Sequence, residues 1–205
     1  APGSRLAAWA HIERAQSHNQ LGDFALALAD AEAALAIRAE GDEGGAALEA
    51  KGVALIGLGR PTEALAAFNE QARQAGTGGS WLGTAHYMLG DYAQAEATLR
   101  DSAANASGEA RQFTLLWLYL AAERQGGRGR EAIADELAAA DAGKWSGALL
   151  SYLGGSLDRE SLLKLAREKP ETEILRLAEA YFFIGQQLAA QGRRGEALPW
   201  FERTL

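Results

Sequence analysis

The residues of this chain best suited to act as acids, bases or metal ligands are its three histidines, His11, His18 and His86. On one helix His11 and His18 would lie two turns apart on the same face, where two imidazoles can share a metal ion. In the repeat described below, the same positions of other units are held mainly by leucine, which indicates side chains that pack between helices. We therefore expect histidines with ordinary hydrogen bonds, no metal site and no cofactor.

Close pairs of carboxylates, such as Asp158 with Glu160 and Glu171 with Glu173, raise the question of general acid–base catalysis. Residues one or two apart on a helix point in different directions, and acidic residues gather at helix starts because the helix dipole favours them there. The glycine-rich stretch AGTGGSWLG, residues 75–83, lacks the lysine and the spacing of a phosphate-binding loop and is typical of a turn. No catalytic constellation emerges, so we expect a protein that is not an enzyme.

Composition and charge narrow the classes of partner. The chain of 205 residues has a net charge of −7, whereas nucleic-acid binding draws on a clustered excess of lysine and arginine. An acidic surface favours basic protein partners over an anionic membrane. The longest nearly apolar run, residues 113–122, is about half of the roughly 20 residues that cross a bilayer. Because the sequence opens APGSRL without methionine, we expect a trimmed start.

A recurring pair of residues divides the chain into units that must position these side chains. In each unit a glycine precedes a small residue by five positions, and the intervals between the glycines are 37, 31, 37 and 65 residues. The last interval holds two units if Ser156 and Ser161 take the two marker positions. A period of about 34 residues is that of the tetratricopeptide helix-turn-helix repeat. The other markers are Gly22 with Ala27, Gly59 with Ala64, Gly90 with Ala95, Gly127 with Ala132, and Gly192 with Ala197.

The markers have physical reasons that predict the fold. Glycine ends the first helix of a unit in a left-handed conformation, and the small residue lets the second helix approach closely. Short helix pairs bury their apolar stripes by stacking on one another, so we expect an all-α, right-handed α-α superhelix of about six units. The predicted first helices are 8–21, 45–58, 77–89, 111–126, 143–154 and 173–191, and the second helices are 24–38, 61–74, 92–104, 130–140, 158–168 and 195–205. The corresponding units of this single array are 8–41, 45–75, 76–107, 111–141, 142–169 and 173–205, the fifth with a degenerate turn.

Three stretches suggest a more specific relationship. FTLLWLYLAAERQ (113–125), KWSGALLSYLGGSL (144–157) and AEAYFFIGQQLAAQG (178–192) resemble, in order and spacing, the NlpI family of bacterial outer-membrane lipoproteins. The resemblance implies a helical scaffold on the periplasmic side of the outer membrane, often a homodimer, that recruits peptidoglycan hydrolases or proteases without chemistry of its own. It also implies that the membrane is contacted only through an N-terminal lipid anchor that is missing from this sequence. A cytoplasmic location is the alternative.

The concave face of such a stack is the candidate binding surface. First helices line that face, and residues at the second, fifth, ninth and twelfth positions of each unit project into it. Aromatic anchors beside hydrogen-bonding groups suit a bound peptide or helix, so we expect protein partners with basic or apolar segments and no nucleic acid. The predicted groove residues are Trp9, Ile12, Gln16, Asn19, Glu49, Val53, Ile56, Ser80, Thr84, Tyr87, Trp117, Arg124, Leu150, Phe182 and Gln186.

The remaining tryptophans and the end of the sequence leave an alternative open. Trp81, Trp145 and Trp200 fall at other positions of the repeat and are expected to pack in the core. Since the sequence stops at Leu205, Trp200 and Phe201 would lack a covering helix. The alternative to an adaptor is therefore a structural subunit of a secretion or pilus machine that assembles by end-to-end stacking.

Overall fold

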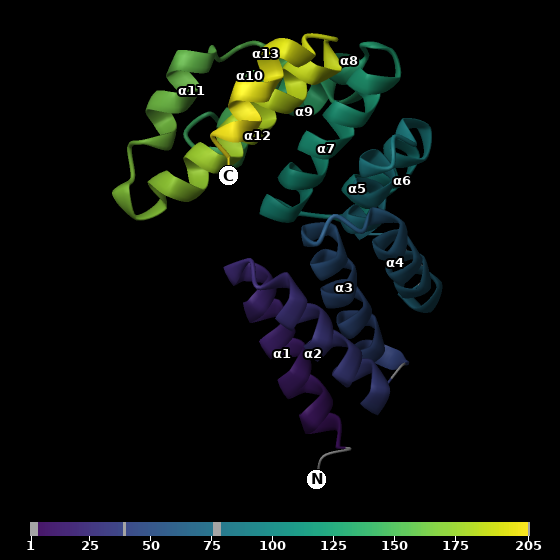
Figure 1. Ribbon diagram of the computed structural model, residues 1–205. Helices are drawn as coiled ribbons and strands as arrows, with labels where there is room; N and C mark the ends of the chain where they lie inside the picture. Colours follow the sequence, from purple (N-terminus) through teal and green to yellow (C-terminus); the bar gives the residue numbers. More distant parts are fainter. Residues whose placement is uncertain (1–3, 39, 76–78, 205) are drawn as a thin grey trace. The chain divides into compact units, whose positions relative to one another are not determined.

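The computed structural model describes residues 4–38, 40–75 and 79–204, and all of its regular structure within these ranges is helical (Figure 1). Residues 39, 76–78 and 205, which belong to predicted units or helices, lie outside the described residues. The first helices of the units are α1 (Arg5–Leu21), α3 (Gly41–Gly57), α5 (Gly79–Met88), α7 (Gly108–Gly126), α10 (Trp145–Gly154) and α12 (Glu173–Ala190). The second helices are α2 (Phe24–Ile37), α4 (Pro61–Ala75), α6 (Tyr92–Asn105), α8 (Gly129–Ala132) with α9 (Ala134–Ala138), α11 (Arg159–Ala166) and α13 (Arg194–Glu202).

The chain is divided into two compact units, Ala1–Thr98 and Leu99–Leu205, and the boundary falls within α6. We call them the N-terminal unit and the C-terminal unit and describe each by itself. Both are built from antiparallel helix pairs, so the predicted all-α repeat fold is confirmed. Among the helices that the structure describes, none combines the length and the apolar character needed to cross a membrane.

In the N-terminal unit each helix packs on the next, from α1 to α5, and the first helices also contact one another, α1 with α3 and α3 with α5 (Figure 1). This is the arrangement that makes a layer of first helices. A buried carboxylate ties the layer at its start. Glu43 in the first turn of α3 pairs with Arg5 of α1 and lies 3.6 Å from Nε of Arg38, which follows α2. The buried charge is thus shared with two cations, as a buried carboxylate requires.

The turns between paired helices confirm the glycine markers, with one exception. Gly22, Gly59, Gly90, Gly127 and Gly192 all have φ between +69° and +81°, in the left-handed region that a Cβ opposes. In the fifth unit the prediction was wrong by one residue. Gly155, with φ +82°, ends α10 there, and Ser156 follows it with its backbone N–H donated to Ser151 O. A serine at that position would have met the steric cost that the glycine avoids.

Close helix packing within a pair depends on matched side-chain sizes sixteen residues apart. Ala15 of α1 and Ala31 of α2 are both fully buried and belong to one cluster. At the same positions of the next unit stand Gly52 of α3 and Phe68 of α4, and a Cβ on Gly52 would lie 2.4 Å from the Phe68 ring. A large side chain on the second helix therefore requires glycine on the first, because interiors are packed to crystal-like density.

The C-terminal unit departs from the predicted pattern at its first pair. The expected helix 130–140 is broken into α8 and α9 at Ile133, whose backbone has φ −134° and ψ +35° and whose side chain is 1% exposed. The break at Ile133 replaces one straight helix with two short ones, and the Ile133 side chain is buried at the break. After α11, a short 3-10 helix (Pro170–Thr172) leads into α12, and no element was predicted at that place.

Candidate partner-binding site

Four of the fifteen predicted groove residues line one hollow of about 220 Å³ in the N-terminal unit. Gln16 and Asn19 come from α1, and Glu49 and Val53 come from α3, at the positions that the repeat register assigns to the concave face. Because α1 packs against α3 along their lengths, residues about 30 apart in the chain meet at one surface. The other lining residues are Gln20, Ala50 and Trp81.

Polar contacts fix two of the lining side chains. The Asn19 amide Nδ2 donates to the Ala50 carbonyl oxygen at 2.9 Å, which ties α1 to α3. Its buried oxygen Oδ1 has no partner, so this carboxamide is not fully satisfied. The Glu49 carboxylate accepts from Gln71 Nε2 of α4 at 2.9 Å and is otherwise exposed. The hollow therefore presents a positioned carboxylate beside amides that can both donate and accept.

Trp81 completes the hollow and was missed by the sequence reasoning, which placed it in the core. Its side chain is 37% exposed and lines the hollow. Its ring stacks on Phe68 of α4, with centroids 6.4 Å apart and planes 8° apart. The sequence held a signal for this role, because Trp81 directly follows Ser80, a predicted groove residue. A shift of one position on a helix turns a side chain by about 100°, and for this reason the repeat register did not assign Trp81 to the groove.

Other predicted groove residues of the N-terminal unit are buried or half-buried in its core. Ile12 is fully buried with Ala34 and Ala47, and half-buried Trp9 packs on that cluster. Thr84 is 2% exposed and its hydroxyl donates to the Ser80 carbonyl oxygen at 3.0 Å. These positions face a neighbouring helix and not the groove, so the prediction was wrong for Ile12 and Thr84.

Tyr87 and Ile56 complete the predicted set of this unit. Tyr87 is 6% exposed and its ring lies 5.4 Å from that of Tyr92, the first residue of α6, so its prediction as a groove residue was also wrong. Ile56, like Val53, is partly buried against the cluster around Leu55 and Phe68. Because the Tyr87 ring packs onto the following helix, it is not exposed on the groove face to which its register position assigns it.

In the C-terminal unit, predicted groove residues of α7 and α12 meet one another. The rings of Trp117 and Phe182 are 5.6 Å apart and tilted by 60°. Two turns further along α7, the Arg124 guanidinium donates to the Ala189 carbonyl oxygen at 3.1 Å and to Gln186 Oε1 at 3.4 Å. All four side chains are half-buried, so they join α7 to α12 and also leave part of their surface to solvent. This pairing makes them part of the packing between first helices.

Leu150 of α10 is the last predicted groove residue, and it is 2% exposed. It forms part of the floor of a second hollow of about 300 Å³, whose rim carries Arg111 and Glu136. Arg111 Nη2 donates to Glu136 Oε1 at 2.7 Å, so these two charges are paired with each other, and the exposed Asp135 also lines the hollow. The prediction of Leu150 as an exposed anchor was wrong, because α10 is covered by both α7 and α11.

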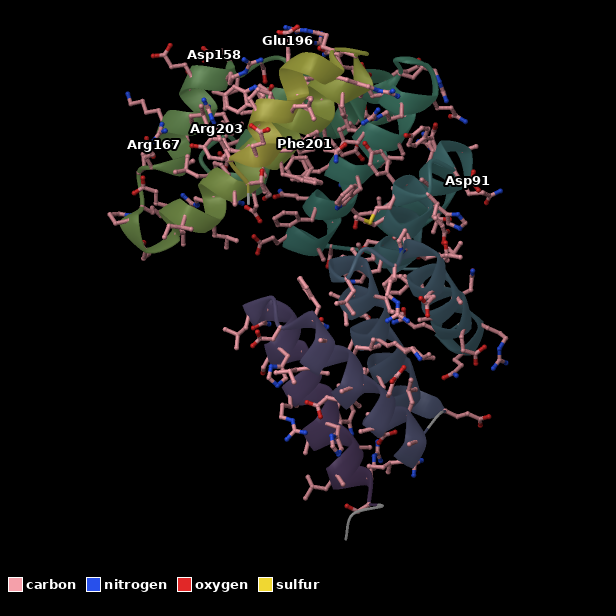
Figure 2. All side chains as sticks on the ribbon, in the orientation of Figure 1. Asp91, Asp158, Arg167, Glu196, Phe201 and Arg203 are labelled. Carbon is pink, nitrogen blue, oxygen red and sulfur yellow. The ribbon has the colours of Figure 1, made fainter. Side chains whose placement is uncertain are left out.

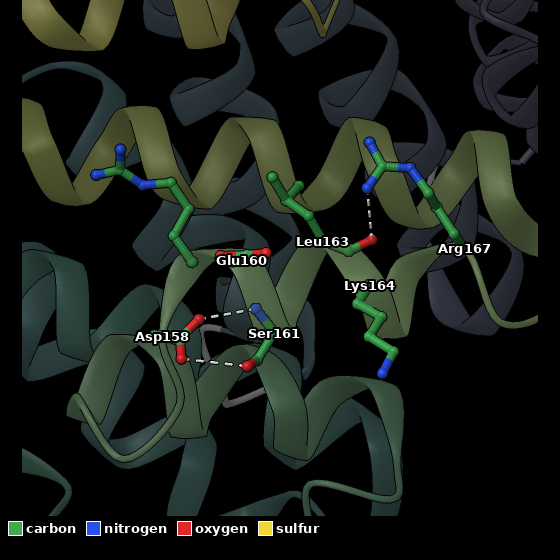
Figure 3. A pocket seen from close by; sticks show the side chains of 7 residues that line it. Asp158, Glu160, Ser161, Leu163, Lys164 and Arg167 are labelled. Atoms are coloured by element: carbon green, nitrogen blue, oxygen red, sulfur yellow. Dashed lines mark hydrogen bonds between the residues drawn. The ribbon is translucent and has the colours of Figure 1, made fainter.

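A third hollow, of about 600 Å³, lies along a single helix, α11 (Figure 3). At its head the Asp158 carboxylate accepts from Ser161 N at 2.8 Å and Ser161 Oγ at 3.2 Å, a helix N-cap. At its far end Arg167 Nη1 donates to the Leu163 carbonyl oxygen at 3.1 Å. Cations and carboxylates alternate along this helix and several are engaged locally, so the hollow offers no single chemistry to a ligand.

The histidines form pairs with aspartates of the N-terminal unit. His11 Nδ1 lies 2.9 Å from Asp30 Oδ1, and Arg14 donates to both oxygens of the same carboxylate at 2.6 and 2.5 Å. His18 Nδ1 lies 3.6 Å from Asp23 Oδ2, and His86 Nδ1 lies 3.6 Å from Asp91 Oδ2. Each of these two aspartates directly follows the turn glycine of its unit. Within the described residues, no three His, Cys, Asp or Glu side chains converge as a metal site would require.

The buried acids of the two units differ in the direction of their pKa shifts. Hydrogen bonds from Arg14 lower the pKa of Asp30, which is 6% exposed. Burial raises the pKa of Glu179 in α12, although Trp145 of α10 donates its indole N–H to the carboxylate at 2.5 Å. Asp30 is therefore held ionised, whereas Glu179 carries a desolvation cost that a single neutral donor does not cancel.

Trp145 and Trp200, which were expected in the core, are half-buried and carry cations on their rings. Arg176 lies over the Trp145 ring at 5.3 Å, and Arg159 and Arg203 lie over the Trp200 ring at 4.9 and 4.8 Å. Contacts of this kind stabilise by about 0.5–1 kcal/mol at exposed sites.

The last helix is not left uncovered. The Trp200 ring lies 5.9 Å from Tyr181, and Phe201 of α13, labelled in Figure 2 together with Arg203 just after that helix, lies 6.4 Å from Phe182. A Cβ on Gly185 would lie 2.5 Å from the Phe201 ring, the same relationship as between Gly52 and Phe68. The expectation that Trp200 and Phe201 lack a covering helix was therefore wrong, because α12 covers both.

Comparison with known proteins supports the repeat and goes no further. The family model described as tetratricopeptide repeat matches residues 8–40, 78–101 and 178–203. These segments correspond to the pairs α1 with α2, α5 with α6, and α12 with α13. No curated protein matches the chain. Three segments of the chain thus match the tetratricopeptide repeat, a repeat that typically mediates contacts between proteins.

Proposed function

We propose that this protein is a non-catalytic scaffold that binds protein partners through the faces of its first helices. The observation that carries the proposal is the hollow lined by Gln16, Asn19, Glu49, Val53 and Trp81, where three successive first helices present side chains to one space. Its mixture of amides, a carboxylate and an exposed indole suits a peptide segment better than a small-molecule reaction, because binding surfaces gain most from aromatic anchors beside hydrogen-bonding groups.

The proposal extends to the bacterial envelope. What supports it is the resemblance of residues 113–125, 144–157 and 178–192 to the NlpI family, and these residues lie in α7, α10 and α12, which pack together in the C-terminal unit. On this reading the scaffold is a homodimer on the periplasmic side of the outer membrane, held there by a lipid anchor, and it recruits peptidoglycan hydrolases or proteases. Fractionation of cells expressing the full-length protein checks the location, and light scattering of the purified protein checks the dimer.

The binding surface is tested by quantitative affinity purification from envelope extract followed by mass spectrometry. The hollow variant carries Gln16→Ala, Glu49→Ala and Trp81→Ala. A matched control carries Leu26→Ala, Asn69→Ala and Gln94→Ala, all exposed residues on second helices. We expect partners that the wild type and the control recover equally and that the hollow variant loses. Equal recovery by all three proteins would remove the first-helix face as the binding surface.

Substitutions at Trp117, Tyr87 or Phe182 are less informative for this purpose. Their rings pack on neighbouring aromatic rings within their own units, so alanine at these positions removes core contacts together with any partner contact. Gln16, Glu49 and Trp81 are exposed and belong to no buried cluster, although Trp81→Ala also removes the ring that stacks on Phe68.

A further inference from the structure

The negative charge of the protein is concentrated in one unit. Residues 1–98 contain six lysines and arginines against twelve aspartates and glutamates, a net charge of −6 out of the total of −7. The hollow described above lies within this unit, and of the described residues that line it Glu49 is the sole charged one. A partner segment that approaches the hollow therefore meets a negative potential. No lysine or arginine among these lining residues opposes that potential.

Building on the proposed function, we infer that this hollow binds a lysine or arginine side chain of an extended partner segment, with its cation between the Glu49 carboxylate and the Trp81 ring. A volume of about 220 Å³ lies below the range of about 300–1,000 Å³ that is usual for small-molecule sites, and it suits one side chain of a larger partner.

The Glu49 carboxylate is available to a cation. One of its oxygens accepts a single hydrogen bond from Gln71, whereas a carboxylate can accept about four. Lys51, the lysine nearest in sequence, is paired with Glu32 Oε1 at 3.0 Å. An apolar occupant would desolvate the Glu49 carboxylate without compensation, but a guanidinium or ammonium group would pair with it.

The Trp81 indole is both exposed and held in place. Its stacking on Phe68 fixes the plane of the ring, since Phe68 is 1% exposed in the cluster with Leu55 and Ala64. Cations are attracted to the face of an aromatic ring, and tryptophan is the strongest of the aromatic side chains in this respect. A ring that is already ordered loses little conformational entropy when it binds.

The amides on the α1 side of the hollow suit the main chain of the partner. Gln16 and Gln20 are exposed there, whereas Asn19 is anchored on Ala50 and its oxygen Oδ1 is buried, so the two glutamines are the amides that a partner can reach. Carboxamides can donate to a peptide carbonyl and accept from a peptide N–H at once. The occupant is thus a peptide segment whose backbone lies along α1 and whose basic side chain enters toward α3 and α5.

The test starts from random peptides displayed on phage and selected on the full chain. The tightest binder is synthesised in two forms, one with its basic residue as arginine and one with citrulline, which keeps the shape and removes the charge. Calorimetry then measures both forms on the wild type, on Glu49→Gln, on Trp81→Ala and on Glu13→Gln, a control at an exposed carboxylate of α1 outside the hollow.

We expect selected peptides rich in lysine or arginine, and about a threefold weaker affinity of the arginine form for Glu49→Gln and about a fivefold weaker one for Trp81→Ala. The citrulline form should not distinguish Glu49→Gln from the wild type, and Glu13→Gln should change nothing. Binders without basic residues, or an equal effect of Glu49→Gln on both forms, would overturn this inference and leave the proposed function standing. A selection that yields no binder at all would overturn both.

Discussion

Addition of one methyl group at Gly52 should have opposite effects on stability according to the residue at position 68. The Cβ of an alanine at position 52 would lie 2.4 Å from two carbons of the Phe68 ring, far inside van der Waals contact. Phe68 cannot withdraw easily, because it is 1% exposed and supports Trp81 on its other side.

The magnitude follows from two opposing contributions. Alanine is favoured over glycine inside a helix by about 1 kcal/mol, and overpacking of a filled core costs about 1–3 kcal/mol. Gly52→Ala should therefore destabilise the wild type by up to about 2 kcal/mol, the difference between these two contributions. Phe68→Ala alone should cost about 3–5 kcal/mol through the cavity that it leaves. In that background the clash is gone, so adding Gly52→Ala should stabilise by about 1 kcal/mol.

The double variant reproduces the pair Ala15 with Ala31, which the first repeat uses at the same two positions. Native-state hydrogen exchange of the backbone amides of α3 and α4 measures the local opening free energy of this helix pair in all four proteins. The reasoning is refuted if Gly52→Ala destabilises the pair by the same amount whether Phe68 or alanine stands opposite.

Three further predictions concern charge and backbone conformation. Because Arg14 lowers the folded-state pKa of Asp30, wild type should be more stable than Asp30→Asn above about pH 4. Urea midpoints should show this advantage disappearing as pH falls through the lowered pKa. A stability difference that does not change with pH would contradict the prediction. Because burial raises the pKa of Glu179, the contribution of this carboxyl group to stability declines as pH rises from about 4.3 through its folded-state pKa. Glu179→Gln should therefore unfold at a higher urea concentration than wild type at neutral pH and lose that advantage in acid. A variant less stable than wild type at neutral pH would argue against a desolvated carboxylate. Gly22→Ala should destabilise the protein by about 1–2 kcal/mol because φ at Gly22 is +80°. Gly45 lies inside α3 with open space at its Cβ, so Gly45→Ala should stabilise by up to about 1 kcal/mol. Thermal unfolding measures both changes, and changes of the same sign would mean that backbone conformation does not control these two sites.

The local sequence determined which segments are helices and where they turn. Glycines at the ends of first helices need the left-handed conformation whatever surrounds them, so Gly22, Gly59 and Gly90 could be read without a structure. The same local logic failed in the fifth unit, where the repeat spacing placed the turn at Ser156 but Gly155 takes it. It failed at Ile133 as well, because the break in the helix there serves the burial of one side chain among residues remote in sequence.

The register of the repeat also determined a face of each helix, and part of the candidate site with it. Gln16, Asn19, Glu49 and Val53 line one hollow because positions on successive first helices repeat with the helix pair. How far a side chain on that face reaches solvent was decided by the tertiary structure alone. Tyr87 is buried against Tyr92, whereas Trp81, one helical position from the expected face, is held at the surface by Phe68 of another helix. Periodicity sets the direction of a side chain from its own backbone, but its exposure depends on the size and placement of the side chains that neighbouring helices bring to it.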